Sequence, residues 1–274
     1  MNNLMFLSLF LITEANNLCA QNCKAFLYQK DTLQYEACRI AEDAYKHYQY
    51  SKEYQEILDM ALAKCPYFSY AYRNKSVAYL KSGDFVTWKY LIDKAVEYNK
   101  MENIGYRGWC RFQFFNDYKG AIADIEELET LTRGNIGYSA GGQYHLRMAK
   151  ALCYKKIGQR TKAIKITESL LSDSSYSVSV FDYLHLGVLY LEDDRYEDAM
   201  NKFLLQEKEN DIAEVHYYMA MCLKKMGNII EFTEQMNIAK KMHISGKKMT
   251  LHYTEPVDRV YLSQIEEELI PKRN

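Results

Sequence analysis

The chain has 274 residues, of which 48% are hydrophobic and 26% are charged, enough apolar material for one elongated domain or two compact ones. Because 35 Lys and Arg residues face 36 Asp and Glu residues, the net charge is −1 and no overall positive field attracts nucleic acid. Only 3 prolines and 12 glycines are present, which disfavours a loop-rich β-sandwich and favours long helices.

Near the N-terminus, residues 4–12 (LMFLSLFLI) form an apolar run that is too short to span a bilayer as a helix. A more polar stretch follows and ends in the small residue Ala20, an order that resembles a secretory signal peptide, although no Lys or Arg precedes the run. The alternative is an apolar first helix that stays attached and packs on the domain. We predict a signal peptide at 1–20 and an N-terminal segment at 21–34, in a periplasmic or secreted protein; the alternative location is cytoplasmic.

No later segment is apolar enough and long enough to cross a membrane, so the mature chain is expected to contain no integral membrane segment.

One spacing recurs along the rest of the chain. Pairs of mostly apolar residues, nine positions apart, return about every 34 residues, with one longer step between the third pair and the fourth. The six pairs are Tyr45 and Tyr54, Tyr79 and Trp88, Phe112 and Ala121, Tyr154 and Ala163, Tyr190 and Ala199, and Leu223 and Phe232.

The stretch at 183–203, YLHLGVLYLEDDRYEDAMNKF, shows what each unit contains. Tyr183, Leu186, Gly187 and Tyr190 lie on one face of a helix, and the small Gly187 permits close approach of a second helix. The turn signal EDDRY then leads into that second helix. Each unit is therefore predicted to be a helical hairpin, and stacked hairpins would share one continuous core.

These positions resemble the tetratricopeptide repeat signature, with Tyr in place of its leading Trp: Tyr183-x2-Leu186-Gly187-x2-Tyr190-x8-Ala199-x3-Phe203. The resemblance covers residues 35–244 as six units. It implies an all-α fold, a right-handed α-solenoid of about six tetratricopeptide-like helical hairpins.

After the sixth unit, residues 245–274 are predicted to form a C-terminal capping helix and tail, because solenoid ends need a polar outer face. Pro256 suits the first turn of that helix, and an apolar stripe follows it.

Residues 137–141 match the G-x-S-x-G nucleophile elbow of serine hydrolases, with Ser139 as the candidate nucleophile. That motif works on a turn from a strand into a helix, whereas the helical pattern AIADIEELETL precedes it here. We therefore predict a flexible loop between repeats, either a tolerated insertion or a flap on the rim of a groove.

The chain contains no H-E-x-x-H and no C-x-x-C motif. We expect no catalytic residue, no metal and no cofactor.

Among the cysteines, Cys153 and Cys222 occupy equivalent places two repeats apart, too far from each other for a disulfide, and are interpreted as small core residues. Cys38 begins the first hairpin and Cys65 ends it, so antiparallel packing would bring them together. In an oxidising compartment these two could form a disulfide; otherwise both thiols stay free.

The resemblance also implies a concave groove lined by the first helix of each hairpin. Carried over position by position, the pattern gives an apolar and aromatic floor with basic rims, which suits an extended or helical peptide with apolar anchors and some acidic residues. Some of these side chains could instead pack between repeats. The residues expected to contact a partner are Arg39, Arg73, Tyr106, Met148, Lys155, Leu184, Tyr217 and Lys224.

The function predicted from the sequence is a non-catalytic protein–protein interaction scaffold, exported from the cytoplasm, that binds a peptide or protein partner and no nucleic acid. One alternative is an intracellular adaptor or co-chaperone-like protein of the same fold. The co-chaperone subtype is disfavoured because Asp43 stands where an Asn would be expected. The distant alternative is a serine hydrolase that uses Ser139.

Overall fold

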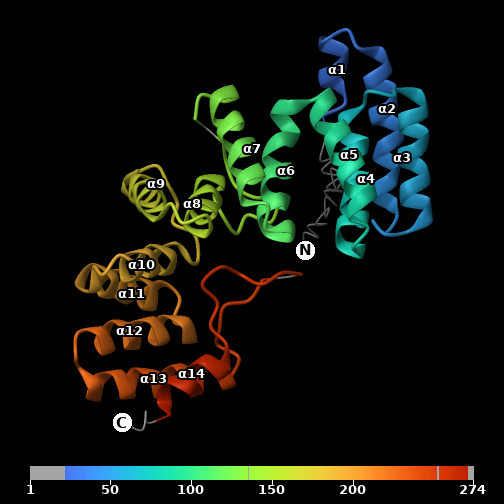
Figure 1. Cartoon of the computed structure of the whole chain (residues 1–274). Coiled ribbons are helices and arrows are strands. Elements are labelled where there is room, and N and C mark those ends of the chain that lie inside the picture. Colours follow the sequence, from blue (N-terminus) through green and yellow to red (C-terminus); the bar gives the residue numbers. More distant parts are fainter. Residues whose placement is uncertain (1–21, 135, 252, 271–274) are drawn as a thin grey trace, which may run out of the picture.

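The computed structural model describes residues 22–134, 136–251 and 253–270. In this part of the chain the regular structure is helical, apart from one isolated β-bridge between Tyr138 and His145. The helices follow one another along a curved row, and the C-terminal segment turns back into the space that the row encloses (Figure 1).

Six helical hairpins make up the row, as predicted, and each consists of two consecutive helices packed against each other. The hairpins, called units one to six, are α2 (Thr32–Glu42) with α3 (Lys52–Lys64), α4 (Ser69–Ser82) with α5 (Phe85–Tyr98), α6 (Lys100–Phe115) with α7 (Tyr118–Leu131), α8 (Leu146–Lys156) with α9 (Arg160–Ser172), α10 (Asp182–Glu192) with α11 (Tyr196–Glu209), and α12 (Ala213–Lys225) with α13 (Ile229–Ile244). A short helix α1 (Lys24–Tyr28) precedes them, a 3₁₀ turn (Asp43–Lys46) follows α2, and α14 (Leu262–Leu269) ends the described chain.

The turns inside the hairpins follow from glycine and aspartate. Gly83, Gly158 and Gly227 end the first helices of units two, four and six with φ values of +85°, +79° and +84°, a conformation that glycine adopts without a steric penalty. In unit two, Asp84 follows at once and its carboxylate accepts a hydrogen bond from the backbone N–H of Thr87, which caps α5. Each of these glycines is the third residue of a K-x-G signal, at 81–83, 156–158 and 225–227, and each signal therefore stops a helix.

Close packing inside unit five depends on a missing side chain. A Cβ atom added to Gly187 of α10 would lie 2.4 Å from Cε1 of Phe203 in α11. Phe203 is fully buried, and its ring stacks on Tyr218 of the next unit with centroids 5.9 Å apart. Gly187 thus lets the phenylalanine join two hairpins into one core.

The first unit is closed by a disulfide other than the one considered possible from the sequence. Cys38 bonds to Cys23, with Cα atoms 5.5 Å apart, whereas Cys65 is a free, buried thiol. The prediction considered only the two ends of the hairpin. It missed that α1 packs on α2 and brings Cys23 beside Cys38.

The C-terminal end also differs from the prediction. The helix that packs on α13 is α14, which begins at Leu262, so Pro256 does not start it. Residues before it have backbone conformations that no α-helix allows, since Tyr253 and Asp258 have φ values of +71° and +67°. We call residues 249–251 and 253–261 the strap; in Figure 1 it is the red segment that projects from α14 into the enclosed space.

Within the described residues, none of the helices combines the length and the apolar character that crossing a bilayer requires. The predicted signal peptide at 1–20 lies outside the described residues.

Replacement of Gly187 by Phe should destabilise unit five, because the added ring would have to displace Phe203. Overpacking of this kind costs about 1–3 kcal/mol or more. Since each hairpin contacts only its neighbours, hydrogen exchange should accelerate in units four to six and change little in units one and two. Leu204→Phe, at an exposed position of α11, is the control that should leave exchange unchanged. Uniform loss of protection along the chain would contradict the solenoid.

Peptide mapping of the protein without reduction should recover a peptide that links Cys23 to Cys38, with Cys65 unlinked. The physical reason is geometric, since the 5.5 Å Cα separation lies in the range that disulfides require. A peptide that links Cys38 to Cys65 would refute this pairing and support the alternative that the sequence left open.

Candidate partner-binding groove

The N-terminal half of the concave face contains an open cavity of about 490 Å³ between α4 and α6. Two residues predicted to contact a partner lie in its wall, Arg73 on α4 and Tyr106 on α6. The guanidinium carbon of Arg73 lies 4.8 Å from the centre of the Tyr106 ring, a cation–π contact that holds both side chains in place. Trp109 and Phe114 add further aromatic surface.

The cavity exists because the first helices of units two and three stay apart. α6 packs against α8, and α10 packs against α12, whereas α4 and α6 make few close contacts with each other. The large side chains of Arg73 and Tyr106 lie between these two helices instead. The loop before α8 closes one side, because Ala140 and Gly141 line the cavity.

Two cations line this cavity. No carboxylate in the described ranges forms an ion pair with Arg73 or with Lys81, which also lines the cavity. The ammonium of Lys81 lies 5.0 Å from the ring centre of Tyr253 in the strap. The open half of the groove therefore presents positive charge beside aromatic rings.

The titratable groups beside Arg73 stay uncharged at neutral pH. Burial raises the pKa of Tyr106 well above its usual value, and it raises the pKa of the Cys110 thiol to about 12. Cys110 is therefore held as an inert thiol, and the Tyr106 hydroxyl keeps its proton.

The C-terminal half of the groove is filled by the strap. The carboxylate of Asp258 lies 2.6 Å from Nζ of Lys155 and 2.8 Å from Nδ1 of His185. Burial opposes ionisation of Asp258, but these two partners outweigh it and hold the pKa of the carboxyl below its usual range. The hydroxyl of Tyr218 donates a hydrogen bond of 3.1 Å to the backbone carbonyl oxygen of Asp258.

Several predicted contact residues are consequently not open to a partner in this structure. The Lys155 side chain is 8% exposed and bound to Asp258, so it is not a rim residue. Met148 and Leu184 are fully buried in the core cluster that also contains Met249 of the strap. The family pattern placed them on an open floor because it contains no segment equivalent to the strap.

The remaining three predicted residues lie at the two ends of the solenoid. Lys224 pairs with Glu268 of α14, and Tyr217 packs in the apolar cluster that includes Leu269. At the other end, Arg39 is exposed and pairs with Glu42 one turn along α2. Of the eight predicted positions, the structure therefore brings Arg73 and Tyr106 together at the open cavity.

Asp258, His185 and Tyr144 form a buried chain that was not predicted from the sequence. The Tyr144 hydroxyl lies 3.0 Å from Nε2 of His185, whose other ring nitrogen meets Asp258. No local pattern distinguishes an aspartate that will be buried from one that will face water. A usable signal in the sequence was that Tyr144 and His185 are large polar side chains near the starts of two otherwise apolar helices, α8 and α10.

Ser139 lacks the geometry of a nucleophile elbow. Its backbone N–H donates to the Tyr144 carbonyl oxygen at 2.7 Å, and its Oγ accepts from the Tyr144 N–H at 3.3 Å. In the described part of the chain no histidine hydrogen-bonds to Ser139, and the helix α7, rather than a strand, precedes the loop. The loop instead forms part of the groove wall, through Ala140 and Gly141.

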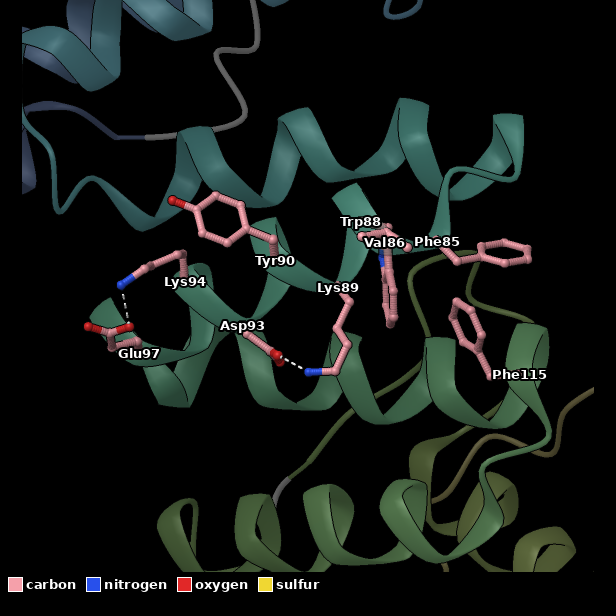
Figure 2. Close-up of a pocket in the computed structure, with 9 residues that line it drawn as sticks. All are labelled: Phe85, Val86, Trp88, Lys89, Tyr90, Asp93, Lys94, Glu97 and Phe115. Carbon is pink, nitrogen blue, oxygen red and sulfur yellow. Dashed lines mark hydrogen bonds and ion pairs between the residues drawn. The ribbon is translucent and has the colours of Figure 1, made fainter.

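A second cavity, of about 570 Å³, lies on the outward face of α5 (Figure 2). At one end of it Phe115 stacks on Trp88 and meets Phe85 edge to face, and Val86 is 84% exposed. Its charged residues neutralise each other within α5, since Lys89 pairs with Asp93 and Lys94 pairs with Glu97. Unlike the concave cavity, it presents no unpaired charge for recognition.

Glu207, Asp211 and His216 bring three potential metal ligands within 4.8 Å of one another, at the junction of α11 and α12. Hydrogen bonds already account for both ring nitrogens of His216, because Nε2 lies 2.8 Å from Asp211 and Nδ1 lies 2.7 Å from Gln235.

No protein-family model matches the sequence, and no curated protein does either. Solved structures do resemble the fold. PilF of Pseudomonas aeruginosa superposes with a TM-score of 0.61 at 12% identity, over 88% of this chain and 99% of that one. PilW, described as a widely conserved type IV pilus biogenesis factor, superposes with a TM-score of 0.58 at 14% identity, over 91% of this chain and 97% of that one.

Both structures are tetratricopeptide-repeat proteins, and nearly their whole length aligns with this chain. The six stacked hairpins and the glycine-dependent packing of unit five agree with that likeness. The chain has the all-α solenoid fold of the tetratricopeptide-repeat proteins.

Proposed function

We propose that this protein is a non-catalytic interaction scaffold that binds an extended peptide, or an extended segment of a larger protein, in the open half of its concave groove. The observation that carries the proposal is the Arg73–Tyr106 pair. A guanidinium is fixed on an aromatic ring at the wall of a cavity, and no carboxylate in the described residues neutralises it.

The chemistry of the cavity suggests what the partner carries. Aromatic walls favour an apolar or aromatic anchor side chain, and a cavity of about 490 Å³ accommodates a few such groups rather than a folded surface. Arg73 suits a carboxylate, because its planar guanidinium can donate two parallel hydrogen bonds to the two carboxylate oxygens. The partner segment is therefore expected to be apolar and acidic.

We further propose that the protein is exported. Cleavage after Ala20 would leave Cys23 in the mature chain, where it bonds to Cys38. Disulfides persist in oxidising compartments such as the periplasm or the extracellular space, so the disulfide supports the signal-peptide interpretation of the apolar run.

Replacement of Arg73 by Gln, or of Tyr106 by Ala, should weaken partner binding, with an expected loss of more than about 2 kcal/mol for the aromatic anchor. The partner is first captured from the native compartment with the wild-type protein and identified by mass spectrometry, and its affinity for each variant is then measured by calorimetry.

Tyr90→Ala is the matched control, because Tyr90 is also an aromatic helix residue but lies on the outward face of α5 and is 59% exposed. It should bind the partner as the wild type does. If Tyr90→Ala and Tyr106→Ala reduced the affinity equally, the partner would not occupy the concave cavity.

Protein recovered from its native host should begin at or near Gln21, because the apolar run at 4–12 would be removed with the signal peptide. N-terminal sequencing or intact-mass measurement determines this directly. Recovery of an intact Met1–Ala20 segment would refute export and favour the intracellular adaptor.

A further inference from the structure

We infer that the strap is a displaceable intramolecular ligand of the groove, and that Asp258 is the latch that keeps it docked. The inference rests on the proposed function, since it concerns access to the same groove. While the strap is docked, a partner meets only the open half; when the strap leaves, units four to six become available as well.

The strap contacts the solenoid as a bound peptide would. It has no helix or strand of its own, and it is held by side chains from the first helices of three consecutive units. Lys155 of α8 and His185 of α10 bind the Asp258 carboxylate, and Tyr218 of α12 binds its backbone carbonyl oxygen. These helices are the ones that face a ligand in solenoids of this type.

The strap is tethered at both ends. On one side the Ala213 N–H donates to the Lys247 carbonyl oxygen, and the N–H of the buried Met249 donates to Glu214. On the other side Val260 and Ile265 are buried against unit six. The middle of the strap can therefore swing out of the groove while α14 stays in place.

Between the tethers, burial is uneven. Tyr253 is 67% exposed and Glu255 is exposed, whereas the Asp258 carboxylate is almost completely enclosed. A buried carboxylate is favourable only while its cationic partners surround it. The docked state thus depends more on the contacts of Asp258 with Lys155 and His185 than on apolar burial of the exposed part of the strap around Tyr253 and Glu255.

The docked strap also borders the open half. Gln113 of α6 hydrogen-bonds to Thr254, and Lys81 lies over the Tyr253 ring. Through His185, Asp258 is connected to Tyr144, whose backbone holds Ser139 beside the cavity wall. A ligand that enters the open half therefore lies next to Tyr253 and Thr254 of the strap. It also lies next to the loop before α8, which is connected to Asp258 through Tyr144 and His185.

The first experiment compares hydrogen exchange of the full-length wild type, Asp258→Asn and Glu255→Gln. Asparagine keeps the shape of the aspartate but removes its charge, and Lys155 retains Glu192 at 2.9 Å, so no lysine is left without a carboxylate. Exchange of strap amides should accelerate at least tenfold in Asp258→Asn, while α8 to α13 stay protected. Glu255→Gln, at an exposed carboxylate whose partners Arg259 and Tyr261 belong to the strap itself and not to the solenoid, should behave as the wild type does.

The second experiment supplies the strap in trans. A fluorescent synthetic peptide of residues 249–261 should bind the Asp258→Asn protein at least tenfold more tightly than the wild type, whose own strap competes for the site. The same peptide with Asn in place of Asp258 should bind neither protein.

Two results would overturn the inference. If α8 to α13 lost protection together with the strap, the strap would be an integral part of the fold. Equal affinity of the peptide for wild type and variant would show that the groove is not its site. Neither measurement uses the unidentified partner, so failure of the Arg73 and Tyr106 test would refute the proposed function without altering these outcomes.

Discussion

A helical hairpin with two apolar faces cannot bury both of them by itself, and the rest of this structure follows from that constraint. In unit five the absence of a side chain at Gly187 admits the Phe203 ring, which fills the hairpin and then stacks on Tyr218 of unit six. Each hairpin is completed by the next: one buried cluster extends from α4 to α12, and a separate cluster lies at each end of the row. The two ends of such a row remain to be covered by something other than another repeat.

Different structural elements cover the two ends of the row. At the N-terminal end, α1 lies on α2 and is bonded to it through Cys23 and Cys38. At the C-terminal end, α14 packs on α13, and Ile265 is its buried residue. The chain segment that leads into α14 passes through the groove on its way, and this path divides the concave face into two halves.

The two halves differ in how their charges are balanced. In the filled half, Lys155 and Lys224 each pair with a carboxylate from the C-terminal segment. In the open half, Arg73 rests on an aromatic ring and has no carboxylate partner in the described ranges. The protein's own strap thus illustrates the kind of contact that we propose for a partner: an extended chain whose acidic side chain neutralises a groove cation. The Arg73–Tyr106 pair and the latch are two parts of one surface.

The sequence by itself determined the repeat, the hairpins and their turns, because these depend on short-range relations. Apolar residues three and four positions apart lie on one helix face, and the glycine of each K-x-G signal ends a helix wherever it occurs. The repeat position also predicted that Arg73 and Tyr106 face a groove. Tertiary structure decided the rest: that Cys38 bonds to Cys23, that Lys155 is buried, and that half of the groove is filled. These outcomes depend on partners such as Asp258, which lies 103 residues from Lys155 and 73 from His185, and no local pattern encodes a contact between residues so far apart.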